Sequence, residues 1–368
     1  MRDILLTLVT LWFLVKIFSR PHIGVYLWTW FGLMNPHKLT YGFAYSFPFA
    51  QLIGGVTLIG LLTGKQKKLN IWSRETIVLL MLIIWICITT VFAANPDGAT
   101  DQLVRFLKIQ LFIFISILLL SDKEKLNGFI WVMVLSIGFY SVKGGIFTIL
   151  TGGSSRVWGP EGTFIGGNNE IALAMLMTVP LMWYLYTQTQ KRWIRMGLIA
   201  AMVLTSTAIL GSQSRGAFLG IVAIGIFFWL KSRQKFKATL LVAVVAGMLV
   251  MLMPQSWVDR MNTIQTYQQD SSAESRINAW TFAWNVGNHK LFGGGANMFV
   301  SDSLREQYSP NPGDYHDMHS IYFQMLGDQG WIGFALFMLL GLFTWFRCSQ
   351  IVRYAQDHPE RQWSADLA

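Results

Sequence analysis

The sequence predicts an all-α integral membrane protein, a polytopic bundle of about 10–12 transmembrane helices with one long polar loop. Of its 368 residues, 53% are hydrophobic and 13% are charged, and a soluble domain carries about twice that charged fraction. The apolar residues form blocks of membrane-spanning length with few charges inside them. The net charge of +10 comes from short Lys/Arg clusters between the blocks. Because these clusters do not form one basic face, the charge does not indicate nucleic-acid binding.

The expected helices follow from the apolar blocks in chain order. The first block resembles a signal peptide but lacks a small-residue cleavage site, so we expect it to be the first helix. The last block is interrupted by Gly-Asp-Gln-Gly at 327–330, which predicts a short helix at the membrane surface followed by a span. The blocks lie near residues 4–19, 21–35, 44–63, 77–93, 103–120, 127–150, 170–187, 194–210, 216–230, 238–253 and 319–346.

Lys and Arg placement predicts the orientation, because cytoplasmic connectors carry an excess of these residues. From residue 64 onward, the basic connectors alternate with connectors poor in Lys and Arg. The basic set contains Lys65, Lys67, Lys68, Arg74, Lys123, Lys125, Lys191, Arg192, Arg195, Lys231, Arg233, Lys235, Lys237, Arg347, Arg353 and Arg361. The connectors predicted to face outside are 94–102, 151–169, 211–215 and 254–318. The first two blocks stay open: either both span and the N-terminus lies outside, or one is short or re-entrant.

The segment 254–318 is rich in Gly, Asn, Asp, Pro and Ser. A loop of that length without secondary structure is usually functional. The shorter outward connectors 151–169 and 211–215 would lie on the same face of the membrane. We therefore expect the functional residues on that face. The two cysteines, Cys87 and Cys348, lie far apart in or beside apolar blocks, so we expect neither a disulfide nor a metal site from them.

The first candidate motif is Gly-Ser-Gln-Ser-Arg-Gly-Ala-Phe at 211–218. Arg215 stands at the outer mouth of a predicted helix, and the small residues beside it allow close approach of a ligand or of a neighbouring helix. The structural alternative is an interfacial arginine whose guanidinium extends to the membrane surface.

The second motif is Glu-Ser-Arg-Ile-Asn-Ala-Trp at 274–280, with Trp284 four residues later. This spacing suits a helix lying on the membrane with its tryptophans at headgroup level. Arg276 is a candidate second cation, because two guanidiniums can each grip the phosphate oxygens of a diphosphate bidentately. The alternatives are an ion pair with Glu274 or a contact with lipid headgroups.

The third motif, Asp-Tyr-His-Asp-Met-His-Ser at 314–320, carries two histidines. His316 and His319 with their flanking carboxylates resemble half of a metal site, but no Cys or Glu partner has the spacing that zinc requires. We therefore expect no metal. His319, which enters a predicted span, is better suited to accept a proton near neutral pH. The structural alternative is an interfacial histidine bonded to a loop carbonyl.

The fourth motif, Arg156 to Glu170, supplies hydrogen-bonding groups at a helix entrance. Arg156, Asn168 and Asn169 are candidate substrate-binding residues, although either asparagine could only cap the following helix. Three cations lie inside apolar blocks, at a cost of about 2.5–3.5 kcal/mol each at the bilayer centre, so we expect them to face the bundle interior. They are Arg105, Lys108 and Lys143. Lys143 lies within reach of a lipid diphosphate at the outer end of its predicted helix.

Four motifs together resemble the O-antigen ligase and polymerase superfamily. They are Gly-Ser-Gln-Ser-Arg-Gly-Ala, Ser-Arg-Ile-Asn-Ala-Trp, Leu-Phe-Gly-Gly-Gly-Ala-Asn-Met-Phe and His-Ser-Ile-Tyr-Phe-Gln-Met-Leu-Gly. The segments 35–42 and 159–170 are similar to those of the O-glycosylation ligases associated with exosortase A systems. The resemblance implies an N-terminal transmembrane region 1–150, a ligase-like region 151–346 that includes the loop 254–318, and a cytoplasmic polar tail 347–368. Family members usually continue with further apolar helices, so C-terminal truncation stays open.

The resemblance implies a GT-C-like glycosyltransferase in the bacterial inner membrane, with its active site facing the periplasm. Such an enzyme transfers a saccharide, with inversion and without metal or cofactor, from a polyprenyl diphosphate to an acceptor hydroxyl on a lipid, protein or polysaccharide. On the matching positions, Arg215 and Arg276 would hold the diphosphate and His319 would activate or orient the acceptor. Lys143, Arg156, Asn168, Asn169 and His316 would bind substrate. Fixed arginines suit this chemistry because negative charge develops on the leaving diphosphate.

Two other functions compete with a ligase. A polymerase that extends the lipid-linked chain uses the same chemistry with a different acceptor, and the sequence does not separate the two. A transporter or flippase of lipid-linked glycans would also need cations, but these would line a path through the bilayer and would commonly accompany an internal repeat. We find no such repeat in the sequence.

Overall fold

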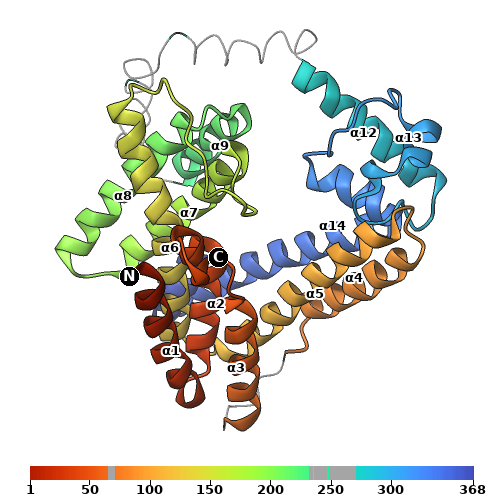
Figure 1. Cartoon of the computed structure of the whole chain (residues 1–368). Helices are drawn as coiled ribbons and strands as arrows, with labels where there is room; N and C mark the ends of the chain where they lie inside the picture. The colour runs from red at the N-terminus through yellow and green to blue at the C-terminus, as the bar shows by residue number, and fades with distance from the viewer. Residues whose placement is uncertain (65–70, 232–234, 236–246, 248–254, 256–270) are drawn as a thin grey trace. The chain divides into compact units, whose positions relative to one another are not determined.

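A computed structural model describes residues 1–64, 71–231 and 271–368, together with residues 235, 247 and 255. All regular elements within these ranges are α-helices or short 3₁₀ helices (Figure 1). The predicted all-α class is therefore confirmed. The predicted helix at 238–253 lies outside the described residues.

The chain divides into two compact units, which we call unit 1 and unit 2. Unit 1 comprises Met1–Lys67, Leu119–Ile264 and Leu367, and unit 2 comprises Lys68–Leu118, Gln265–Asp366 and Ala368. The helices of unit 1 are α1 (Arg2–Ser19), α2 (His22–Met34), η1 (Pro36–Leu39), η2 (Phe43–Tyr45), α3 (Phe49–Thr63), α6 (Lys123–Leu150), α7 (Asn168–Gln188), α8 (Arg192–Gly211) and α9 (Arg215–Lys231). Those of unit 2 are α4 (Arg74–Val91), α5 (Pro96–Leu119), α12 (Ser271–His289), η4 (Met298–Val300), α13 (Asp302–Tyr308), α14 (Ile321–Gln356), η5 (Pro359–Arg361) and α15 (Gln362–Leu367).

Six of the described helices are long and apolar enough to cross a membrane: α4, α5, α6, α7, α8 and α14. Two shorter apolar helices, α3 and Arg215–Phe227 within α9, accompany them. Many large apolar side chains on these helices are exposed, among them Leu62, Val91 and Met177. Water would disfavour such a surface, whereas lipid tails cover it at no cost. The protein is therefore a multi-pass membrane protein, and the full number of 10–12 spans stays a prediction.

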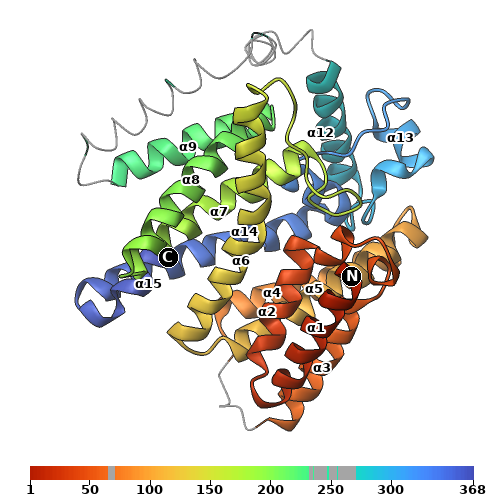
Figure 2. The same cartoon turned by 60° about the vertical axis from the view of Figure 1, so that its left-hand side comes forward.

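Unit 1 is built around α6, which packs against α2, α7 and α8 (Figures 1 and 2). Glycines allow this close approach: a Cβ on Gly145 would lie 2.2 Å from the Leu204 carbonyl oxygen of α8. The hydroxyl of Thr205 on α8 donates to Ser141 on α6 at 2.8 Å. Small residues and hydroxyl hydrogen bonds are the usual means of joining membrane helices, because lipid gives helices no hydrophobic reason to associate.

The N-terminal helices are held to α6 and to each other. The Tyr26 hydroxyl on α2 donates to the Lys125 carbonyl at the start of α6, at 2.5 Å. At the N-terminal end of α1, the Asp3 carboxylate accepts from the backbone amide of Gly42 at 2.9 Å. With 13 residues, α2 is about 20 Å long, short of the roughly 30 Å hydrocarbon core. The structure therefore favours the alternative in which one of the first two blocks is short.

Helix α14 confirms the predicted interruption of the last apolar block. Gly330 has φ 66° and ψ −176°, and helix continues on both sides of it. The carbonyls freed by the break are satisfied by a neighbouring glycine loop: the Gly294 amide donates to Gly327 at 2.8 Å and the Gly295 amide to Asp328 at 2.9 Å. The Trp85 indole of α4 donates to the Gln329 carbonyl at 2.8 Å. These bonds fix the bend between the two parts of α14.

One expectation about an irregular segment is wrong. The region 254–318 is not a loop without secondary structure, because α12, η4 and α13 lie within its described part. Helix α12 includes residues 274–284, where the tryptophan spacing predicts a helix. In the polar stretch 347–368, α14 continues to Gln356 and α15 follows. The apolar content of these segments is too low to reveal their helices from hydropathy alone.

Candidate functional site

The candidate residues form two clusters, one in each unit. Unit 1 contains Lys143, Arg156, Asn168, Asn169 and Arg215, and unit 2 contains Arg276, His316 and His319.

In unit 1, the loops before α7 and before α9 are joined by hydrogen bonds. The Val157 amide donates to the Gly211 carbonyl at 3.0 Å. The side-chain amide of Gln213 makes two bonds: its Nε2 donates to the Gly153 carbonyl at 3.1 Å, and its Oε1 accepts from Arg156 Nε at 3.2 Å. The two motifs that were separate candidates in the sequence therefore form one structure, in which Gln213 holds the Arg156 guanidinium.

The turn that presents Arg215 has a constrained backbone. Helix α8 ends at Gly211, Gln213 adopts the left-handed conformation with φ 54°, and α9 begins at Arg215. The Ser214 hydroxyl caps α9 by accepting from the Ala217 amide at 3.3 Å. Arg215 is thus the first residue of a capped helix and is half-buried. The helix N-terminus and the guanidinium both favour an anion at this position.

The small residues around Arg215 have different surroundings. A Cβ on Gly211 would lie 2.0 Å from the Thr148 hydroxyl of α6, so Gly211 serves the packing of α8 on α6. A Cβ on Gly216 would meet no described atom within 4 Å. Gly211 is therefore a glycine because α8 packs closely on α6 at this point. Of the two glycines, Gly216 is the one with open space beside it that a ligand could occupy.

The asparagines at the start of α7 are not its caps. The N-cap is Gly167, without a side-chain cap bond, and Asn168 is the first helical residue. Buried Asn168 instead donates from Nδ2 to the Ser212 carbonyl at 2.9 Å, and Asn169 is exposed. The capping alternative is therefore wrong, because the Asn168 amide finds a carbonyl of the neighbouring turn.

The three cations within apolar blocks do not face the interior of their own units. Lys143 on α6 is exposed, and so are Arg105 and Lys108 on α5. The expectation that they face the bundle interior is wrong for the units as described. Long side chains of this kind can extend along a helix toward the membrane surface, which avoids most of the desolvation cost.

In unit 2, helix α12 lies against the segment that carries the histidines. The Trp280 indole donates to the Met318 carbonyl at 2.8 Å, immediately before His319, and Trp280 stacks on Phe323 of α14. Arg276 precedes Trp280 by four residues and therefore shares its helix face. The structure thus brings the Arg276 side of α12 to the His319 segment. Trp284 is exposed, and its place at headgroup level stays a prediction.

Arg276 itself is half-buried. Within the described part of the chain it makes no ion pair with Glu274, because residues two apart point to opposite sides of a helix. The alternative of an intrahelical pair is therefore wrong. A contact of Arg276 with an anionic headgroup or a diphosphate stays a prediction.

His319 has a strained backbone. Its φ is 46°, a left-handed conformation that is uncommon for residues other than glycine and costs on the order of 1–3 kcal/mol. Ser320 follows in an extended conformation, and its carbonyl accepts from the Gln324 amide at 2.8 Å as α14 begins. The imidazole is exposed and has no hydrogen-bond partner among the described residues. Such strain is concentrated at functional residues.

His316 has a different environment. Its Nδ1 lies within hydrogen-bond distance of the Asp314 carboxylate, and its side chain is largely exposed. The other Asp314 oxygen accepts from Asn278 of α12 at 3.3 Å. Asp317 does not join this pair, because its carboxylate accepts from the Met318 amide at 2.7 Å. The two histidines therefore do not share the flanking carboxylates.

Arg305 was not among the sequence candidates. Its side chain on α13 is 2% exposed, donates to the Phe299 carbonyl at 2.8 Å and pairs with Asp302. Its guanidinium lies 3.4 Å from the ring centroid of Tyr315. The pair Asp302–Arg305 is readable from its three-residue spacing, but no periodicity indicates the contact with Tyr315. Arg305 anchors the loop that carries His316.

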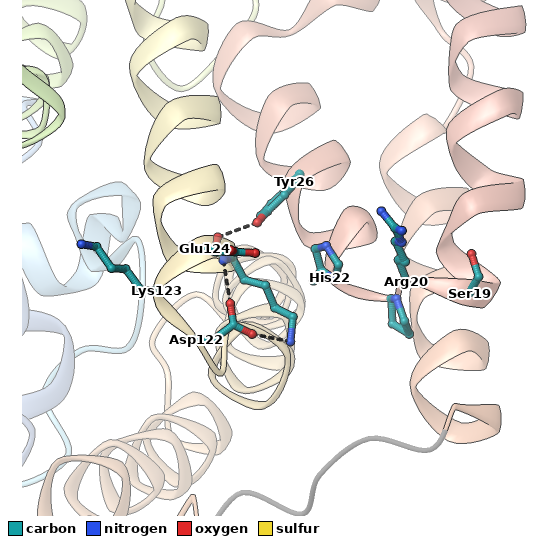
Figure 3. A pocket seen from close by; sticks show the side chains of 9 residues that line it. Ser19, Arg20, His22, Tyr26, Asp122, Lys123 and Glu124 are labelled. Atoms are coloured by element: carbon teal, nitrogen blue, oxygen red, sulfur yellow. Dashed lines mark hydrogen bonds and ion pairs between the residues drawn. The ribbon is translucent and has the colours of Figure 1, made fainter. Parts of the chain in front are cut away.

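A cavity of about 760 Å³ in unit 1 lies between the α1–α2 turn and the start of α6 (Figure 3). Its acidic and basic side chains include the ion pair Lys125–Asp122 at 2.8 Å. The side-chain and backbone hydrogen bonds from Lys125 hold the pKa of Asp122 below its usual range. Lys123 points away from the other labelled side chains (Figure 3). Since its described lining contains no predicted site residue, the cavity is not our candidate site.

Comparison with protein families gives two matches, of which the first ends just after α7 and the second begins within α8. Residues 1–190 match a family of unknown function, DUF5935, and residues 200–338 match the O-antigen ligase family. No curated protein matches the chain. The motifs at 35–42 and 159–170 lie in the first range, and Arg215, Arg276 and His319 lie in the second. The first match covers more than half of the chain, which therefore belongs to the DUF5935 family and carries an O-antigen ligase domain at residues 200–338.

Proposed function

We propose that this protein is a membrane glycan ligase of the exosortase-associated O-glycosylation type. It transfers a saccharide from a polyprenyl diphosphate to an acceptor hydroxyl at the periplasmic face of the bacterial inner membrane. One observation carries the proposal: the O-antigen ligase match contains Arg215, Arg276 and His319, the three residues to which we assign the chemistry. The Trp280–Met318 hydrogen bond, which holds α12 beside the His319 segment, supports a joint role of Arg276 and His319.

In the proposed reaction, the acceptor oxygen attacks the anomeric carbon and the bond from that carbon to the diphosphate oxygen breaks, with inversion. Negative charge then develops on the diphosphate. Arg215 and Arg276 stabilise it, since a guanidinium can grip phosphate oxygens bidentately. His319 activates or orients the acceptor hydroxyl. Lys143, Arg156, Asn168, Asn169 and His316 bind substrate, and neither a metal nor a cofactor takes part.

The acceptor distinguishes a ligase from a polymerase that extends the lipid-linked chain. The transporter or flippase alternative differs in kind, because it predicts movement of the donor across a membrane without a new glycosidic bond. The active-site histidine separates these classes: a flippase has no need for a residue that activates a hydroxyl.

The test uses purified protein, a polyprenyl-diphosphate glycan and a panel of lipid, protein and polysaccharide acceptors. We expect glycan transfer to at least one acceptor, resistant to chelators. We expect a loss of at least about 10²-fold in the variants Arg215→Ala, Arg276→Ala and His319→Ala. The matched control is His289→Ala, an exposed histidine at the end of α12, which should retain the wild-type rate. Transfer at the wild-type rate in His319→Ala, or donor transport without transfer by the wild type, would contradict the proposal.

A further inference from the structure

The Asp314–His316 pair has the architecture of a catalytic base. One oxygen of the Asp314 carboxylate lies at Nδ1 of His316, and the other accepts from Asn278 Nδ2 at 3.3 Å. The side chain of Asp314 is 9% exposed, whereas that of His316 is 57% exposed. The carboxylate is therefore held inside and the imidazole is presented at the surface of unit 2.

This arrangement determines which nitrogen of His316 can accept a proton. A carboxylate at Nδ1 keeps the proton of the neutral ring on that nitrogen, so the lone pair is on Nε2. Nε2 has no hydrogen-bond partner among the described residues. When Nε2 gains a proton, the adjacent Asp314 carboxylate stabilises the resulting imidazolium. An exposed histidine without such a carboxylate has neither property.

The loop that carries the pair is anchored on two sides. The Tyr315 ring, between Asp314 and His316, covers the buried guanidinium of Arg305, a cation–π contact that also restrains its neighbours. Asn278, which holds Asp314, lies on α12 two residues after Arg276. The helix of the proposed diphosphate-binding arginine therefore also positions the pair.

His319 lacks a comparable partner. Its imidazole makes no hydrogen bond to any described residue, and its distinguishing feature is the left-handed backbone. Two histidines three residues apart thus differ in the property that a general base requires, an oriented and stabilised imidazole.

We propose, resting on the glycan-transfer function above, that His316 is the general base of the reaction and that Asp314 is its positioning residue. His316 Nε2 takes the proton of the acceptor hydroxyl as the acceptor oxygen bonds to the anomeric carbon. The bond from that carbon to the diphosphate breaks, and its electron pair leaves with the polyprenyl diphosphate. The imidazolium then returns its proton to water. His319 orients the acceptor.

The test measures kcat, the acceptor KM and the pH profile of kcat in purified His316→Asn, His316→Ala and Asp314→Asn. His316→Asn preserves a donor toward Asp314 while removing the base, so it should fold even if His316→Ala does not. We expect kcat to fall about 10²–10⁴-fold in the His316 variants, with a much smaller change in the acceptor KM and with donor binding retained. The acidic limb of the pH profile, which reports protonation of the base, should disappear. Asp314→Asn should lower kcat and shift that limb.

The controls separate this proposal from the general function. His289→Ala should keep the wild-type rate and pH profile. If the wild type transfers no glycan, the proposed function fails. If the wild type transfers glycan and His316→Asn keeps its kcat and acidic limb, only the role of His316 fails. Loss of that limb in His319→Ala but not in His316→Asn would identify His319 as the base and overturn the proposal.

Discussion

At the scale of single residues, both turns that present candidate catalytic side chains contain a left-handed residue other than glycine. Gln213 has φ 54° two residues before Arg215, and His319 itself has φ 46°. In each case a serine follows and a helix then begins. Both candidate residues therefore lie in or directly after a strained turn at the start of a helix.

Replacement of His319 tests this strain separately from the chemistry. We expect His319→Gly to be more stable than His319→Ala by about 1–2 kcal/mol, because only glycine tolerates the left-handed conformation freely. Both variants should lose transfer. The measurement is thermal unfolding of the purified pair in one detergent.

Thr281 provides the matched comparison. It is exposed in the middle of α12, where helical geometry makes glycine less stable than alanine by about 1 kcal/mol. The glycine variant should therefore be the more stable of the two at His319, and the alanine variant the more stable at Thr281. The same order at both positions would contradict the strain at His319.

The surroundings of single residues could not be predicted from the sequence. The identities of Arg215, Arg276 and His319 followed from motifs, but their surroundings did not. Asp314 and His316 lie two apart in a loop without periodicity, so only the folded chain reveals that they pair. Asn168 fits the cap pattern in sequence, yet Ser212 from a distant turn supplies its partner.

At the scale of elements, hydropathy located the membrane helices because each must cover a stretch of lipid with apolar side chains. The break in α14 was also predictable, since Gly-Asp-Gln-Gly interrupts an apolar block. Helix α13 was not, and α12 was indicated only by its tryptophan spacing, because their apolar faces pack within unit 2 around Met298 and Met318. The close approach of α6 and α8 depends on Gly145 meeting the Leu204 backbone and on Gly211 meeting Thr148, and the sequence pattern alone does not reveal these contacts.

Gly330 allows a direct test of whether the break in α14 requires a glycine. Gly330→Ala should lower stability by at least about 2 kcal/mol, because its backbone conformation is nearly exclusive to glycine. The new Cβ would also lie 2.3 Å from the Leu291 carbonyl oxygen. Thermal unfolding and the monodisperse fraction after purification measure this loss.

Gly341 is the control in the same helix. A Cβ there meets no described atom within 4 Å, so Gly341→Ala should be neutral or stabilising by up to about 1 kcal/mol. If Gly330→Ala were as stable as Gly341→Ala, the break would not require glycine.

At the scale of the whole molecule, the distribution of basic residues predicts which connectors share a side of the membrane. The α1–α2 turn and the start of α6 line one cavity (Figure 3), so they lie on the same side. Lys123 and Lys125 predict that this side is cytoplasmic. The loops before α7 and α9, which bond to each other, are predicted to face the periplasm.

Single cysteines test this topology in a background with Cys87 and Cys348 replaced by alanine. Cysteines at Ser19 and Glu124 should react with an impermeant reagent only after the membrane is permeabilised. Cysteines at the exposed positions Trp158 and Leu291 should react in spheroplasts with an intact inner membrane. Labelling of Ser19 and Glu124 from opposite sides would contradict the shared cavity, and inverted labelling of all four would reverse the predicted orientation.

The hydrogen bonds from Gly294 and Gly295 to the open carbonyls of α14 affect the kinetics of local opening. A surface loop normally exchanges its amide protons quickly, because it can open without disturbing the rest of the fold. These two amides replace the next turn of a helix, so releasing them would leave carbonyls of the buried residues Gly327 and Asp328 without a donor. We therefore expect the loop and the helix break to open as one cooperative unit, which would give this irregular segment the amide-exchange protection of a core helix.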